Sequence, residues 1–543
     1  MFDAGPPSRR PGILISTWYR CAQCPYSVSL QNVRNKDAIE DILRVYFTRT
    51  TLSKMTYITR LTDAHRQSAG PHILTYITKT MRSRLHSPVM VYLFWSTTLL
   101  LVGCGTPTVH ELPTYMIDQD QVAATVEAIE LKTGQSVLSG ETDGAAWIGQ
   151  IPYNWNGNLV IYAHGFRGEN SELTIDPAPE FEFLVEKGFA WAASSYRRNS
   201  YDPGVGVQDT RNLTVIMQDL LRESGGELQN TYITGMSMGG HITVAAIEQY
   251  PSLYQGALPM CGVIGDVELF DYFLDYNLGA AAIAGIPPTF TMPDEDWVSN
   301  TVVDIKAAFS SNPNGAWAGG RAQMQGESSP LTEQGEAFKS FVETGSGGKR
   351  VTFDLAWIYW HGLVDSTGDF FYSLGADDGT LANRPGLVAQ NVDMSYQTEY
   401  GFEIDDQIKR QTAASYNRDP QNLDLPAPIV RGEPEIPVLS IHTTGDLFVP
   451  IEMQQIYAQE VKENDRSHLL VQRAIRDVGH CSFTSEEIQQ SYTDLFSWVE
   501  TGDRPLGEDL SGDISAPDLG CQFTKGDGGS GLRSFVETCS SGE

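Results

Sequence analysis

The sequence predicts an α/β protein with a doubly wound, mostly parallel sheet, and two observations carry that prediction. Short apolar runs such as 158–163 have no polar interruption, which is typical of strands buried on both faces of a parallel sheet. These runs alternate with segments of helical periodicity, and such alternation favours right-handed crossovers. The pattern stops near residue 263 and resumes at residue 436.

The expected elements follow in chain order. We expect early strands and a turn within 105–150. Further strands are expected at 158–163, 189–195, 230–234, 256–262, 436–442 and 469–475. Helices are expected at 209–223, 241–250, 451–462 and 484–501.

Residues 264–435, which we call the insertion, interrupt this pattern with a stretch rich in aromatic residues, Gly and Pro. Helical pieces are expected at 266–284 and 331–343, and we expect the whole segment to cover the C-terminal ends of the strands as a lid. Its aromatic side chains are candidates for an apolar acyl or aromatic pocket, although we expect most of them to form the insertion's own core: Phe270, Tyr272, Phe273, Tyr276, Trp297, Trp317, Trp357, Tyr359, Trp360, Phe370 and Phe371.

The charge of the 543-residue chain is −31 and unevenly distributed. Residues 1–103 contain 13 Lys and Arg and five Asp and Glu, a net charge of +8, so the remainder carries −39. This charge argues against a nucleic-acid partner, because proteins that bind nucleic acids need a positively charged surface. A strongly anionic body favours neutral or cationic substrates over anionic polymers.

The boundary between these two parts has the features of an export signal. Arg82 and Arg84 precede an apolar run, 91–103, whose 13 residues are shorter than the roughly 20 that span a bilayer. Leu101-Val102-Gly103-Cys104 resembles the lipobox of bacterial lipoproteins, which implies lipidation of Cys104 and anchoring to the outer membrane, in the periplasm or at the cell surface. The alternative is a buried apolar helix that ends in Cys.

Signals stand at the N-terminus, so we expect translation to start at Met81 or Met90. The predicted organisation is an over-called extension (1–80), a signal peptide (81–103), a core in two parts (104–263 and 436–505) around the insertion (264–435), and a tail (506–543).

Four further cysteines follow Cys104, and an even number in an exported protein indicates disulfides, with three possible connectivities. Cys521 and Cys539 bracket a short tail rich in Gly and Ser, which favours a bond between them and leaves Cys261 with Cys481. The alternative, four reduced thiols, is disfavoured in an oxidising compartment.

The strongest chemical signal is Gly235-Met236-Ser237-Met238-Gly239-Gly240, between an expected strand and an expected helix. This is the context that a Gly-x-Ser-x-Gly nucleophile elbow requires. Glycines two places either side of the serine avoid clashes in the sharp turn. Ser237 would therefore present its hydroxyl from the tip of the turn.

Residues 145–263 and 436–500 resemble the α/β-hydrolase superfamily in motif order and spacing, with serine esterases similar to feruloyl esterases and tannase, or peptidases of the prolyl-oligopeptidase type, as the nearest groups. The family order is Ser, then Asp or Glu, then His. The resemblance implies Ser237 as nucleophile, Asp446 in Gly445-Asp446-Leu447-Phe448-Val449-Pro450 as the acid, and His480 in Gly479-His480-Cys481 as the base.

The resemblance also implies an oxyanion hole and a disulfide. The N–H of Met238 and the N–H of Phe166 in His164-Gly165-Phe166-Arg167 would hold the oxyanion, with Arg167 as the alternative to Phe166. Cys261 ends the strand after the nucleophile helix and Cys481 adjoins the candidate base; in this fold these two ends lie near one another along the C-terminal edge of the sheet, so we expect the two cysteines to be bonded. Tannase and fungal feruloyl esterases join residues beside their Ser and His in this way, but Met236, not Cys, precedes Ser237.

Several side chains compete with these assignments. Asp477 and Asp365 are rival acids; we expect Asp477 to face solvent, and Asp365 falls in the insertion. His164, His241 and His442 are expected to be structural.

The sequence thus predicts a serine hydrolase that cleaves small-molecule carboxylic esters through an acyl-enzyme. Aromatic esters are candidate substrates, because the insertion offers aromatic side chains for a pocket. No metal-ligand spacing, phosphate-binding loop or dinucleotide fingerprint is present, so no cofactor is expected. The alternatives are a serine peptidase, which would usually carry an N-terminal propeller, and a non-catalytic binding lipoprotein on the same scaffold.

Overall fold

A computed structural model describes most of the chain from residue 114 onward. The described residues are 114–288, 297–314, 317–324, 327–364, 370–374, 388–396, 398, 400–423, 425–526, 531–536 and 539. Residues 107–543 form one compact unit. The expected extension, signal peptide and lipidation site lie outside the described residues. Within the described ranges, no helix combines the length and apolarity needed to cross a bilayer.

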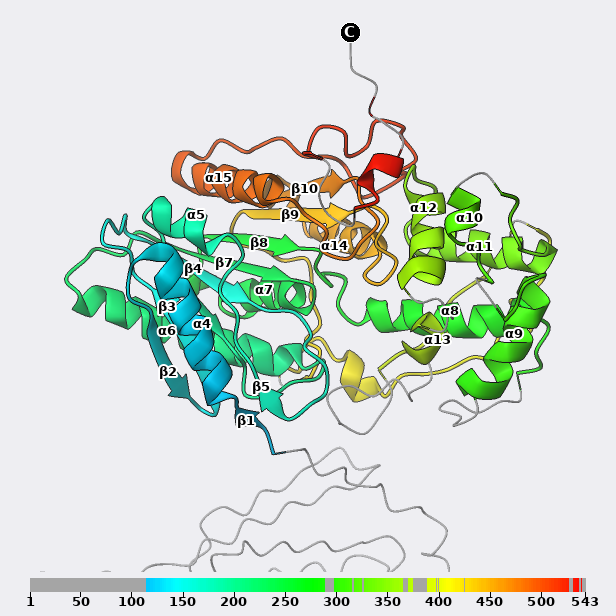
Figure 1. The fold of residues 1–543 in the computed structure, drawn as a ribbon, viewed down its shortest axis with the longest axis horizontal. Coiled ribbons are helices and arrows are strands. Elements are labelled where there is room, and N and C mark those ends of the chain that lie inside the picture. The colour runs from blue at the N-terminus through cyan, green and yellow to red at the C-terminus, as the bar shows by residue number, and fades with distance from the viewer. Residues whose placement is uncertain are drawn as a thin grey trace, which may run out of the picture. The chain divides into compact units, whose positions relative to one another are not determined.

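An eight-stranded sheet organises the unit (Figure 1), and its strand order is β10-β9-β8-β7-β4-β6-β3-β2. β2 pairs antiparallel with β3 and β3 with β6, whereas every other pairing is parallel. The strands are β2 Leu138–Thr142, β3 Ala145–Gln150, β4 Asn158–Ala163, β6 Ala190–Ser194, β7 Asn230–Met236, β8 Gly256–Met260, β9 Val438–Thr443 and β10 Leu470–Ile475. A small separate sheet pairs β1 Met116–Ile117 with β5 Glu172–Leu173. The predicted α/β class with a mostly parallel sheet is confirmed.

Helices cover both faces of this sheet, which is why the central strands are buried along most of their length. β4 is buried at all six positions. Its Val160 packs in the cluster formed with α4 Gln119–Thr133, α5 Phe181–Glu186 and α15 Ser485–Thr501. Leu159 and Ile161 point the other way, toward α6 Pro203–Glu223, on the face that α7 Met238–Gln249 and α14 Glu452–Glu463 also cover.

Two helices differ from the sequence-based expectation. α4 occupies part of the segment where only strands and a turn were expected, and it buries a single residue, Ile129, so it has no apolar stripe to reveal it. α6 begins at Pro203 rather than at residue 209, because Asp202 caps it by accepting the N–H of Val205. Proline at the first helical position fits such a start, since its missing N–H would have no partner there.

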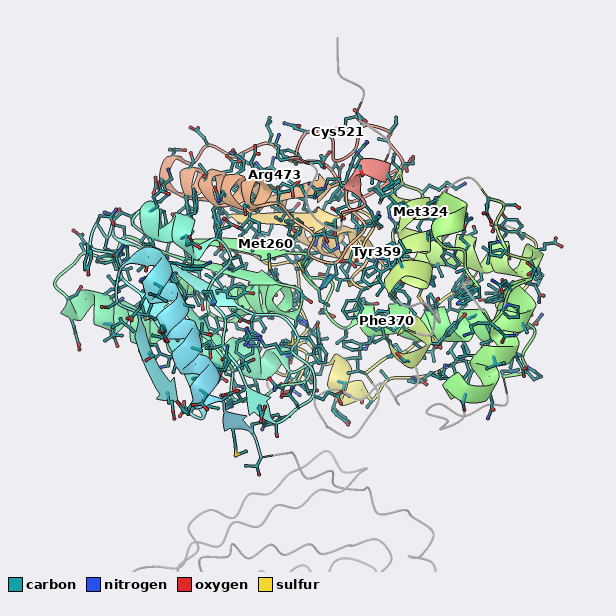
Figure 2. The ribbon with its side chains drawn as sticks, viewed as in Figure 1. Met260, Met324, Tyr359, Phe370, Arg473 and Cys521 are labelled. Atoms are coloured by element: carbon teal, nitrogen blue, oxygen red, sulfur yellow. A yellow bond between two sulfur atoms is a disulfide. The ribbon has the colours of Figure 1, made fainter. Side chains whose placement is uncertain are left out.

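The insertion forms a helical layer beside the sheet (Figure 1), with its own aromatic core. Its helices are α8 Glu268–Ile283, α9 Val302–Phe309, α10 Arg321–Met324, α11 Glu333–Gly345, α12 Phe353–Ile358 and α13 Phe370–Leu374. Trp297, Trp317 and Trp357 are fully buried in that core. Tyr359 and Phe370 are only partly buried and lie between the insertion helices and the sheet (Figure 2).

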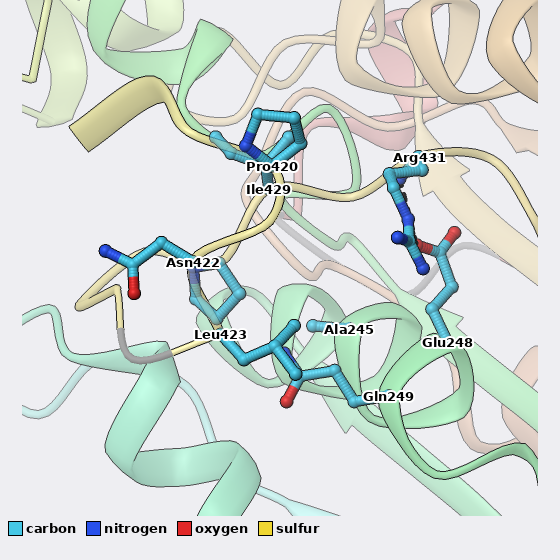
Figure 3. Close-up of a pocket in the computed structure, with 9 residues that line it drawn as sticks. Ala245, Glu248, Gln249, Pro420, Asn422, Leu423, Ile429 and Arg431 are labelled. Atoms are coloured by element: carbon cyan, nitrogen blue, oxygen red, sulfur yellow. Dashed lines mark hydrogen bonds and ion pairs between the residues drawn. The ribbon is translucent and has the colours of Figure 1, made fainter. Parts of the chain in front are cut away.

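The end of the insertion returns to the core beside α7. The Glu248 carboxylate accepts the backbone N–H groups of Arg431 and Glu433, each at 2.9 Å, which fixes the approach to β9. A small hollow lies at this junction (Figure 3), lined by Ala245, Glu248, Gln249, Pro420, Asn422, Leu423, Pro428, Ile429 and Arg431. None of the candidate site residues lines it.

Candidate active site

Ser237 is the single residue between β7 and α7. Its backbone has φ 59° and ψ −123°, a conformation that non-glycine residues rarely adopt. The N–H of Ser237 donates to the carbonyl of Met260 at the end of β8, 3.1 Å away, so the neighbouring strand supports the turn. The strain is thus held by the sheet, as a nucleophile elbow requires.

Close backbone packing explains the glycines around Ser237. A Cβ on Gly235 would lie 2.0 Å from the carbonyl oxygen of Gly239, and one on Gly239 would lie 2.0 Å from that of Ala163. A Cβ on Gly240 would lie 2.4 Å from the Cα of Gly262. All three obstacles are backbone atoms, so no side-chain rotation relieves them.

Asp446 and His480 meet at the same edge of the sheet. Asp446 follows β9, His480 follows β10, and the two strands are parallel neighbours. His480 Nδ1 lies 2.5 Å from Asp446 Oδ2. Asp446 Oδ1 accepts the N–H groups of Phe448 and Val449 at 2.9 and 3.0 Å, which fixes the orientation of the fully buried carboxylate.

This pairing sets the tautomer of His480. Because Nδ1 donates its proton to Asp446, Nε2 is left as the acceptor. His480 Nε2 is buried and has no hydrogen-bond partner within the part of the chain that the structure describes, Ser237 Oγ included. The Phe448 ring stands edge-on to the imidazole, with centroids 5.3 Å apart. The site therefore holds an oriented imidazole, whose Nε2 can accept a proton, beside the ring of Phe448.

Both expected disulfides are present. Cys261 is bonded to Cys481, so the residue after β8 is linked to the residue after His480. Cys521 is bonded to Cys539 in the tail. Cys261, Cys481 and His480 also form the one group of potential metal ligands found among the described residues, but two of these three side chains are bonded to each other and offer no thiolate.

The loop after β4 lies against the nucleophile. A Cβ on Gly165 would lie 3.1 Å from the Cβ of Ser237, so backbone and nucleophile are in near contact. Phe166 follows and is 45% exposed, and Met238, directly after Ser237, is buried at the start of α7. Arg167 is committed elsewhere, to the carbonyl of Thr174 and to Asp176.

Comparisons with known proteins found a curated relative and several similar solved structures. No family model matches the chain. It is 24% identical, over 438 residues covering 70% of this chain and 91% of the relative, to o-phthalyl amidase from Xanthobacter agilis. Among solved structures it is similar to feruloyl esterase B from Aspergillus oryzae (12% identity, 68% and 80% of the chains, TM-score 0.39). It is also similar to an acylaminoacyl peptidase from Pyrococcus horikoshii (12% identity, covering 69% of this chain and 42% of that chain, TM-score 0.31).

The strand order, with a strained serine after β7, an acid loop after β9 and a histidine loop after β10, decides the fold. The chain has the α/β-hydrolase fold.

Within this α/β-hydrolase fold, one rival acid has a different environment from the one expected. Asp477 does not face solvent; it is fully buried and forms an ion pair with Arg533, whose Nε lies 3.0 Å from its Oδ2. The expectation was wrong because the tail covers the loop, a contact 56 residues distant in sequence. Asp365 lies outside the described residues.

The three histidines expected to be structural are buried and hydrogen-bonded. Burial lowers the pKa of His164 to about 3 and that of His241 and of His442 to about 4. His164 Nδ1 lies 2.6 Å from the Gly165 carbonyl. His442 Nε2 lies 2.8 Å from the carbonyl of Val449, so it supports the acid loop. The expected structural role is confirmed for each of them.

Sequence reasoning missed the residues of the insertion that hold the acid loop, residues 443–449. Tyr272 donates its hydroxyl to the carbonyl of Leu447 (3.0 Å), and the Nε of buried Arg350 donates to that of Thr444 (2.6 Å). Trp360 Nε1 donates to the carbonyl of Gly445 (3.1 Å) and to that of Val478 (2.9 Å). Each contact joins residues at least 85 positions apart, so no local motif signals them.

Proposed function

We propose that this protein is a serine hydrolase that cleaves small-molecule carboxylic esters through an acyl-enzyme, with Ser237, Asp446 and His480 as its triad. The observation that carries the proposal is the 2.5 Å contact between His480 Nδ1 and Asp446 Oδ2, at the sheet edge where Ser237 sits in a strained turn. These are the nucleophile, base and orienting acid of acyl transfer.

The chemistry follows from the orientation of the imidazole. His480 Nε2 takes the proton of Ser237 Oγ as that oxygen attacks the carbonyl carbon, and Asp446 stabilises the imidazolium. The N–H groups of Met238 and Phe166 hold the developing oxyanion, each worth roughly 2.7–4 kcal/mol in comparable sites. His480 then protonates the leaving group, and water activated by the same imidazole hydrolyses the acyl-enzyme.

Amides are the second candidate class of substrate, because the relative from Xanthobacter agilis is named an amidase and aligns over most of its length. A matched pair of p-nitrophenyl esters and anilides with the same acyl groups separates the two classes. Anilide turnover comparable with ester turnover would assign an amidase, and turnover of peptide anilides alone would assign a peptidase.

A fluorophosphonate probe tests the catalytic residues directly. We expect covalent labelling of Ser237 in folded protein, and loss of both labelling and turnover in Ser237→Ala. Ser224→Ala, at the end of α6, is the control and should behave as wild type. Folded protein that neither labels nor turns over any ester or amide would instead support a non-catalytic binding protein.

We also propose that the protein is exported and lipid-anchored through Cys104. Two disulfides suit an oxidising compartment. Metabolic labelling with a radioactive fatty acid should mark the wild type and not Cys104→Ala. Equal labelling of both proteins would contradict the anchor.

A further inference from the structure

The C-terminal tail places a guanidinium inside the core. Arg533 belongs to a short 3-10 turn, Arg533–Phe535, yet its side chain is only 5% exposed. It contacts two fully enclosed acids: Nε lies 3.0 Å from Asp477 Oδ2, and one terminal nitrogen lies 2.8 Å from Glu487 Oε1. The other terminal nitrogen donates to the carbonyl of Ser482, 3.0 Å away.

These partners bracket the candidate base. Asp477 stands three residues before His480, and Ser482 stands two residues after it. Asp477 Oδ1 accepts the N–H groups of Val478 and Gly479 at 2.7 and 3.2 Å, so the same carboxylate shapes the loop. One guanidinium therefore joins the start of the histidine loop, residues 476–483, to its end.

Glu487 extends this connection to α15. Its other oxygen accepts the N–H of Thr484 at 2.7 Å and so completes the capping box that starts the helix. Two carboxylates buried this closely repel each other, and a buried charge without a partner is strongly destabilising. The guanidinium between them offsets both effects and fixes the distance from loop to helix.

The rest of the tail holds Arg533 in place. Arg533 donates to the carbonyl of Lys525 (2.9 Å), and the N–H of Lys525 donates to Glu487 (2.7 Å). The Cys521–Cys539 disulfide closes the segment that carries Arg533 into a loop.

We propose that Arg533 is a positioning residue for His480, which makes the tail part of the active-site architecture. The inference rests on the proposed function, since it assigns to Arg533 the task of keeping the histidine loop in register with Ser237. Loss of the guanidinium would leave Asp446 in place but remove a contact from each end of the loop that carries the base. A misplacement of about 1 Å in a catalytic group costs on the order of 10²-fold in rate.

Arg533→Met tests this, with Arg473→Met as the matched control. Arg473, labelled in Figure 2, is also buried, and its terminal nitrogen lies 2.6 Å from Asp494 on the same helix, α15. Among the described residues, the hydrogen bonds of its side chain involve Asp494 and Leu506 but not the histidine loop. We expect Arg533→Met to lower kcat and the rate of Ser237 labelling by roughly 10- to 100-fold with KM nearly unchanged. Arg473→Met should lower the melting temperature while leaving kcat as in wild type.

A charge-neutral variant covers the case in which Arg533→Met does not fold. Asp477→Asn, Glu487→Gln and Arg533→Met together remove all three charges and keep the side-chain volumes, which avoids the uncompensated acids. We expect this triple variant to fold with the same loss of kcat. Wild-type kcat in either folded variant, or an equal loss in Arg473→Met, would overturn the inference. A wild-type protein that neither turns over nor labels would refute the proposed function instead.

Discussion

The indole N–H of Trp360 lies 3.1 Å from the carbonyl oxygen of Gly445, the residue directly before Asp446. The same N–H lies 2.9 Å from the carbonyl of Val478, two residues before His480. One side chain of the insertion therefore bridges the two loops that carry the candidate acid and base. A segment that opened as a moving lid would have to break these bonds in every cycle.

Trp360→Phe should keep the ring but remove this bridge. Two buried carbonyls would lose a donor, at roughly 1–3 kcal/mol each in the free energy of unfolding, and the acid and base loops would lose their shared contact. We expect lower stability and lower kcat. Trp357→Phe is the control, because its N–H donates to Ala318 within the insertion. Chemical denaturation and ester kinetics on both variants distinguish them; equal kcat in the two would contradict a role for the bridge.

Asp446→Asn should fold but lose activity. The amide oxygen can still accept the N–H groups of Phe448 and Val449, while the amide nitrogen would donate to His480 Nδ1 and reverse its tautomer. The corresponding change in serine proteases lowers kcat about 10⁴-fold, and we expect a similar loss with little change in melting temperature. A variant with most of its activity intact would remove Asp446 from the triad.

The two disulfides should differ in their contribution to stability. Cys261 and Cys481 are 220 residues apart in sequence, against 18 for Cys521 and Cys539. In the chain-entropy description this difference makes the first bond worth about 2 kcal/mol more. Denaturation of the two double Cys→Ser variants measures it. A larger loss on removing the tail bond would show that native contacts, not unfolded-chain entropy, dominate.

Stability should fall as pH rises through the neutral range. Burial raises the pKa of Asp266 to about 8, although its carboxylate accepts the N–H of Val430 at 2.7 Å. The folded protein keeps this proton while the unfolded chain releases it above about pH 4, so the stabilisation is complete below pH 4 and is lost by about pH 8. Burial also raises the pKa of Glu452 and of Glu460 to about 8, so their titration changes stability in the same direction.

Asp266→Asn isolates this effect, because the amide oxygen can still accept the N–H of Val430. Melting temperatures at pH 5 and pH 8 should differ less in this variant than in wild type. Asp304→Asn, an equal change of charge at an exposed position of α9, should leave the difference unchanged. Identical pH dependence in wild type and Asp266→Asn would show that this carboxyl does not titrate in that range.

Local signals were sufficient for the central elements and for the candidate triad. β4 has the predicted bounds, because five consecutive apolar residues follow Asn158 and all six positions are buried. Ser237 could be found because its turn demands glycines within a few residues, and the Asp446 and His480 loops carry comparable local motifs. α4 could not be found in this way, since its exposed surface leaves no apolar periodicity.

The supporting contacts of the site were beyond sequence reasoning. Trp360 looked like one aromatic among many in the insertion, and its partners Gly445 and Val478 are 85 and 118 residues away. Arg533 stands in a Gly- and Ser-rich tail with no recognisable pattern, so the burial of Asp477 could not be anticipated. Such contacts depend on how distant segments meet in three dimensions.

The bonds from the insertion to the acid loop have a consequence for engineering. A shortened enzyme made by deleting residues 264–435 would lose the donors from Tyr272, Arg350 and Trp360 together, and with them the support of Asp446. Transplanting the same segment onto another hydrolase would require the recipient's acid loop to offer carbonyls at matching positions.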